Sequence, residues 1–128
     1  MTTAVAALGG ISLLVGAVGI FTIMTIAVRE RTSEIGLLRA LGAPHGQVLA
    51  LFLGEAAALA ALGGVAGLVI GVGGGQLLHF LIPTLPVYTP LAVVVLAMFV
   101  STTIGLIAGV LPARRAARLD PVEALRTE

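Results

Sequence analysis

The longest charge-free stretch of this sequence is the feature that most constrains its fold. Between Arg39 and Arg114 the only formally charged residue is Glu55, so the segment from Ala56 to Ala113 carries no fixed charge. Charged residues make up 10% of the 128 residues, whereas soluble domains contain roughly 25%. A soluble domain needs more charged side chains than this to cover its surface. We therefore predict an integral membrane protein.

Three apolar segments are long enough to cross a bilayer, whose core of about 30 Å needs about 20 helical residues. They predict transmembrane helices at about residues 4–28, 49–75 and 91–111. The expected fold class is an all-α membrane protein, with residues 1–128 forming one transmembrane domain. The middle apolar stretch could instead turn back at Gly63 and Gly64 and form a fourth span.

The distribution of arginines separates these two topologies. Arginines lie in the segments 29–46 and 112–128, whereas the connection 81–90 has no charge. Basic loops stay in the cytoplasm. Three spans put both basic segments there, but four would export the basic tail. We expect a multi-pass protein of the cytoplasmic membrane, with its N-terminus outside and its C-terminus cytoplasmic. Because such an N-terminus is unusual, we also expect further sequence to precede it.

Several kinds of chemistry have no residues to carry them. The sequence has no cysteine and no lysine, which excludes a disulfide and a Walker A phosphate loop. Neither His45 nor His79 has a second ligand-type residue at useful spacing, so we expect no metal site. No nucleophile–base pair is present, and nothing implies nucleic acid. We predict a non-enzymatic chain without a cofactor, in which a partner supplies any ATP hydrolysis.

The segment 29–46 contains a short helix, at about residues 33–41. Thr32 can cap it, Gly42 marks its exit and Pro44 follows. Its apolar arc and its polar end residues are the candidate partner-binding positions, namely Glu34, Ile35, Leu37, Leu38, Arg39 and Leu41. A one-sided apolar helix needs either a protein partner or the lipid headgroups. These residues alone leave both possibilities open.

Turn chemistry marks the ends of the last span and of the tail. Thr89 is a candidate N-cap with Pro90 at the first helical position, and Pro112 is expected to close or kink the helix. Asp120 and Glu123 then have the spacing of a capping box, which predicts a short helix at residues 121–126.

Small residues recur at four-residue spacing in the second and third spans. The candidate packing positions are Gly63, Gly67, Gly71, Gly75, Gly105 and Gly109. Such stripes let helices approach closely in lipid. They are consistent with packing inside this chain, with a dimer seam, or with both on different faces.

Glu55 is the one carboxylate inside a predicted span. An ionisable group there is by default a functional hypothesis and needs a partner. Proton or ion handling is one interpretation. We favour a structural role, in which Glu55 pairs with an arginine such as Arg114 or bonds to the backbone.

Two terminal motifs resemble a known family. Residues 28–43, VRERTSEIGLLRALGA, resemble the cytoplasmic segment of FtsX-like, MacB-type ABC transporter permeases, and residues 111–126, LPARRAARLDPVEALR, resemble their C-terminal signature. The pair Gly54-Glu55 and the run from Gly63 to Gly71 resemble the family's third helix. The likeness covers nearly the whole chain, but only the last three of the family's four spans. We therefore expect a fragment or a shortened relative.

The resemblance implies a permease that couples to an ABC ATPase through the helix at 33–41. It would transmit ATPase motion across the membrane for export, lipoprotein release or mechanotransmission. The alternative is a membrane anchor that recruits an ATPase or assembly factor without transport. An ion-driven transporter using Glu55 would normally need more polar groups within the membrane.

Overall fold

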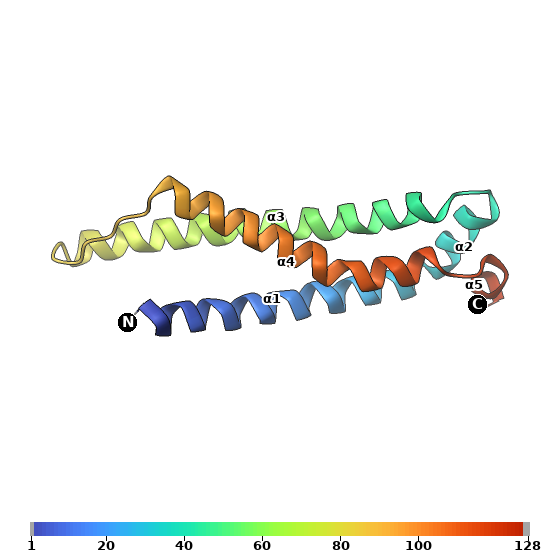
Figure 1. Ribbon diagram of the computed structural model, residues 1–128, viewed down its shortest axis with the longest axis horizontal. Helices are drawn as coiled ribbons and strands as arrows, with labels where there is room; N and C mark the ends of the chain where they lie inside the picture. Colours follow the sequence, from blue (N-terminus) through green and yellow to red (C-terminus); the bar gives the residue numbers. More distant parts are fainter. Residues whose placement is uncertain (1, 127–128) are drawn as a thin grey trace.

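The computed structural model describes residues 2–126, which form five helices and no strand. Their bounds are α1 Thr2–Glu30, α2 Thr32–Ala40, α3 His45–Leu81, α4 Leu91–Ala117 and α5 Pro121–Arg126. Of these, α1, α3 and α4 are long and apolar enough to cross a membrane (Figure 1). The predicted fold class, an all-α protein with three membrane-spanning helices, is confirmed.

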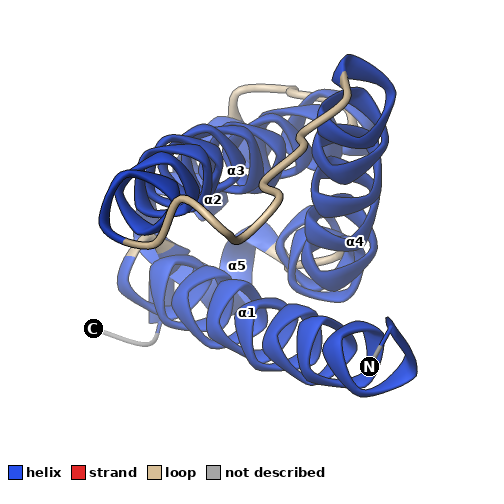
Figure 2. Ribbon diagram, turned by 90° about the vertical axis from the view of Figure 1, so that its left-hand side faces the viewer, coloured by secondary structure: helices blue, strands red, loops and turns tan. Residues whose placement is uncertain are grey.

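Helix α4 is the centre of the bundle. It packs against both α1 and α3, whereas α1 and α3 scarcely touch each other (Figure 2). The start of α1 and the connection 82–90 lie at one end of the bundle, and α2 and α5 lie at the other (Figure 1). The two arginine-rich segments therefore share one end, which we call the basic end.

The long helices extend beyond the predicted spans. Helix α3 begins at His45 and ends at Leu81, and α4 continues past Pro112 to Ala117. Pro112 therefore does not close the helix, because the loss of one N–H donor is tolerated in membrane helices whose neighbours compensate. Thr89 is not the N-cap of α4 either. That position belongs to Pro90, which was predicted to be the first helical residue, and α4 begins at Leu91 as the predicted span does.

The buried core lies toward the basic end. It contains Met24, Val28, Ile35, Val48, Phe52, Ala56, Ala113, Ala116 and Ala117. Four of these nine residues are alanines, so the helix backbones approach closely there. Elsewhere the apolar side chains point outward, and at most 11% of the most apolar window of each span is buried. In a membrane protein such surface faces lipid or another protein.

Glycines make the contact between α3 and α4 possible. A Cβ added to Gly105 would overlap the Cβ of Ala60, and one added to Gly109 would overlap that of Ala56. By contrast, Gly63, Gly67 and Gly71 have no neighbour within 4 Å of such a Cβ, and at Gly75 it would lie 3.2 Å from Val87. Only part of the predicted glycine stripe is thus filled within this chain.

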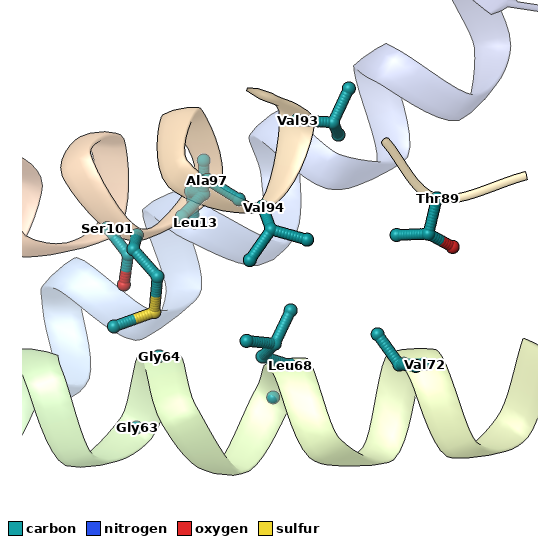
Figure 3. Close-up of a pocket in the computed structure, with 13 residues that line it drawn as sticks. Leu13, Gly63, Gly64, Leu68, Val72, Thr89, Val93, Val94, Ala97 and Ser101 are labelled. Atoms are coloured by element: carbon teal, nitrogen blue, oxygen red, sulfur yellow. The ribbon is translucent and has the colours of Figure 1, made fainter. Parts of the chain in front are cut away.

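The open glycines line a gap between α3 and α4. In Figure 3, Leu68 of α3 points toward Val94 of α4, Val72 lies opposite Thr89, and Gly64 lies below Ser101. This cavity has a volume of about 420 Å³. A larger apolar groove of about 970 Å³, lined by all three long helices, shares several of its residues.

Replacing Gly105 with leucine should destabilise the bundle, because the new side chain must separate α4 from Ala60. Overpacking of this kind typically costs about 1–3 kcal/mol. The matched control is Gly73→Leu, since Gly73 has open space around it. Thermal unfolding in detergent should show a lower Tm for Gly105→Leu than for Gly73→Leu. Equal Tm values would contradict the close packing of α3 and α4.

Candidate functional site

Helix α2 follows α1 almost without interruption. The Arg31 N–H donates to the Ala27 carbonyl at 3.0 Å, and the Ile35 N–H donates to the Arg31 carbonyl at 2.9 Å. Thr32 does not cap α2 as predicted, because Arg31 holds the N-cap position. Instead the Thr32 hydroxyl donates to the carbonyls of Val28 and Arg29. It thereby satisfies acceptors that the end of α1 leaves without helical partners.

The predicted apolar arc of α2 is divided between two environments. Ile35 is only 3% exposed and belongs to the buried core. Leu37, Leu38 and Leu41 are 55%, 43% and 77% exposed. These three residues form an exposed surface that we call the leucine face. The polar members of the predicted set differ too, since Glu34 is exposed and Arg39 is half-buried.

Helix α5 packs against the inner side of α2. A Cβ on Gly36 would lie 2.8 Å from the Cβ of Ala124, which is buried. The carboxylate of Asp120 accepts a hydrogen bond from the Val122 N–H at 3.0 Å, as predicted for a capped helix. Within residues 2–126, the return bond from Glu123 is not formed. The contact between Gly36 and Ala124 was not predicted, although a glycine inside a short helix is a signal of close approach.

Glu55 joins α3 to the junction of α1 and α2. Its Oε1 lies 2.7 Å from Nη1 of Arg31, rather than bonding to Arg114. The hydrogen bond and the charge of Glu55 both raise the pKa of Arg31 further above its ordinary value. Arg31 therefore stays charged, and the pair depends on Glu55 being ionised. The proposed structural role of Glu55 thus has an observed partner at the basic end.

His45 links three helices by hydrogen bonds. Its Nδ1 bonds to the carbonyl of Ala117, and Nη2 of Arg39 lies 3.2 Å from its Nε2. A carbonyl can only accept, so we assign the proton to Nδ1, which leaves Nε2 free to accept from Arg39. The last turn of α2, the start of α3 and the end of α4 are joined in this way. Sequence reasoning missed the link, because a backbone carbonyl has no residue signature.

No metal-binding cluster occurs in the described part of the chain. His79, the second histidine, bonds to the carbonyl of Leu85 at 2.8 Å at the opposite end of the bundle.

Helix α2 is held on its inner side by α5, by the core and by two polar links. Its leucine face stays uncovered.

Comparisons with known proteins identify the family of this chain. Residues 6–121 match the family described as FtsX-like permease C-terminal. The chain therefore belongs to the FtsX-like family of ABC transporter permeases.

Three relatives illustrate the range of the family. The chain is 47% identical over its full length to the ABC transporter permease YknZ of Bacillus subtilis. It is 46% identical to the macrolide export ATP-binding/permease protein MacB of Wolinella succinogenes, again over its full length. Over 95% of the chain it is 46% identical to the pyoverdine export ATP-binding/permease protein PvdT of Pseudomonas entomophila. The chain spans 32%, 20% and 18% of these relatives.

Replacing Gly36 with valine should undock α5, because the added atoms collide with Ala124. The control is Ala40→Val, which adds the same side chain at an exposed position of α2. Limited trypsin digestion should cleave after Arg118 several times faster in Gly36→Val than in Ala40→Val. If both variants were cut at the wild-type rate, α5 would not be held by α2.

Proposed function

We propose that this chain transmits the motion of an ABC ATPase across the cytoplasmic membrane, with α2 as the coupling helix. The observation that carries the proposal is the leucine face of Leu37, Leu38 and Leu41, exposed on a helix whose opposite side is packed. Its placement between two spans at the basic end also supports it. Transport is then mechanical, and this chain supplies no chemical step.

A protein partner explains the leucine face better than lipid headgroups do. Burying one leucine side chain contributes roughly 1.5–3 kcal/mol relative to leaving it in water. Three adjacent leucines on a firmly held helix therefore offer a useful docking energy without the cost of ordering the helix. Three membrane spans already anchor the chain, so adsorption of α2 to the membrane surface would add little.

The contacts behind α2 supply a route for the motion. A push on α2 reaches α3 through the Arg31–Glu55 pair and reaches the end of α4 through His45. Helix α4 contacts both other long helices, so its displacement would change the groove at the far end.

We also propose that a second copy of the permease completes the working pair. The open glycines Gly63, Gly67 and Gly71 would contact this second copy.

Export is the process that we propose for this motion. MacB and PvdT are named for the export of macrolides and of pyoverdine. Because the matched region is shared by relatives named for different cargoes, we assign to it the common mechanical step. Cargo choice would belong to other parts of such transporters.

Replacing Leu38 with aspartate should abolish coupling, because it places a charge in the docking surface. Leu85→Asp is the matched control, since Leu85 is 41% exposed but lies at the opposite end of the bundle. The cognate ATPase should co-purify with wild type and Leu85→Asp but not with Leu38→Asp. ATP turnover in bilayers should follow the same pattern.

Two outcomes would count against this function. Unchanged ATPase binding and ATP turnover in Leu38→Asp would indicate that α2 lies against the lipid headgroups instead of an ATPase. A second outcome is that Leu38→Asp loses ATPase binding, but the ATPase hydrolyses ATP at the same rate with and without the wild-type chain. That result would favour a membrane anchor that recruits an ATPase without transport.

The proposed orientation puts the basic end in the cytoplasm. The chain has no cysteine, so a single introduced cysteine reports on one position. In intact cells, Thr84→Cys should react with an impermeant thiol reagent, and Ala43→Cys should react only after lysis. Labelling of Ala43→Cys from outside would reverse the orientation.

A further inference from the structure

A basic recess opens between the start of α3 and the end of α4. It has a volume of about 380 Å³. Its lining residues are His45, Gly46, Leu49, Arg114, Ala117 and Arg118. We propose that this recess binds the phosphate of an anionic phospholipid headgroup. This inference does not depend on the coupling function of α2.

The arginines of the recess have no counter-charge among the residues that the structure describes. Within residues 2–126 the one ion pair is Arg31–Glu55, so neither Arg114 nor Arg118 pairs with a carboxylate. The two arginines stand four residues apart, Arg114 in the last turn of α4 and Arg118 at its C-cap, and both are exposed. Like charges at this spacing repel each other on a helix. A phosphate bound between them relieves that repulsion and can accept hydrogen bonds from both guanidinium groups.

The remaining walls shape the recess for a headgroup. His45 is fixed in place by its bond to the Ala117 carbonyl, and Arg39 lies behind it and adds a third positive charge. Gly46 has no side chain, which keeps the opening wide. These walls hold no carboxylate that would repel an anion.

The position of the recess favours a lipid over a soluble anion. Leu49 lies one turn further along α3 and gives the recess an apolar side. Beyond it α3 and α4 expose the apolar surface of the spans. A lipid can therefore place its phosphate among the arginines and its acyl chains along the same two helices. Basic pockets between membrane helices at this level suit anionic headgroups.

The recess also differs from an undirected excess of positive charge. Arg115 stands between the two arginines in sequence and is also exposed, but it does not line the recess. A general attraction of basic residues to an anionic membrane treats all three arginines alike. A shaped site requires Arg114 and Arg118 and is indifferent to Arg115.

The test measures lipid retention by the purified chain. The test compares wild type with the double variant Arg114→Gln/Arg118→Gln. Two single variants, Arg115→Gln and Arg126→Gln, serve as controls. Each protein is placed in nanodiscs of dioleoyl phosphatidylcholine with a few per cent dioleoyl phosphatidylglycerol. Native mass spectrometry in 150 mM salt then counts bound lipids. We expect wild type and both controls to retain phosphatidylglycerol equally. The double variant should retain at least tenfold less, with unchanged helix content by circular dichroism.

Competition distinguishes the source of the phosphate. Millimolar inorganic phosphate should displace little of the bound lipid. Complete displacement by phosphate, or equal retention of phosphatidylcholine, would overturn the lipid site. A loss in Arg115→Gln that is as large, per arginine removed, as the loss in the double variant would show diffuse attraction instead. Unchanged lipid retention in the double variant, with loss of ATPase co-purification, would assign these arginines to a protein partner.

Discussion

The close contact of α3 with α4 is the interaction on which the rest of the structure depends. In lipid, apolar side chains gain little by leaving one apolar surface for another, so tight packing must hold the helices together. Gly105 and Gly109 allow Ala60 and Ala56 to approach the α4 backbone directly. Toward the basic end, the core next to this contact consists of alanines and a few large side chains. Toward the opposite end, the three long helices leave the apolar groove open between them.

The same packing gives the basic end its rigidity. Because the ends of α3 and α4 are fixed relative to each other, His45 can reach the Ala117 carbonyl and hold Arg39 of α2. Gly36 then brings α5 against the inner side of α2. A helix supported in this way can receive a load on its outer face without folding away.

The sequence predicted the elements of this fold better than their contacts. Absence of charge between residues 56 and 113 indicated membrane spans, and the placement of arginines indicated three of them. Helix ends were less predictable, since Pro112 lies within α4 and Thr89 does not cap it. The length of an apolar segment reflects the thickness of the bilayer core. The helix itself can continue beyond that segment as long as its backbone hydrogen bonds are satisfied.

The kind of side-chain partner could be predicted where chemistry restricts the choice, but the particular residue could not. Glu55 needed a cation, and the sequence offered arginines at two helix ends, but helix packing selected Arg31 over Arg114. The division of the apolar arc of α2 also depends on tertiary contacts. Periodicity places Ile35 beside the leucines, and only the presence of the core shows that Ile35 is buried while they are exposed.

The central claim is that the leucine face of α2 contacts an ABC ATPase. The most direct measurement is photo-crosslinking from an unnatural amino acid at Leu41, compared with the same probe at Phe80, in membranes of cells that express the complete transporter. Mass spectrometry of the products should identify an ABC ATPase crosslinked to the probe at Leu41 and none at Phe80. Adducts of lipid alone at Leu41 would contradict the account.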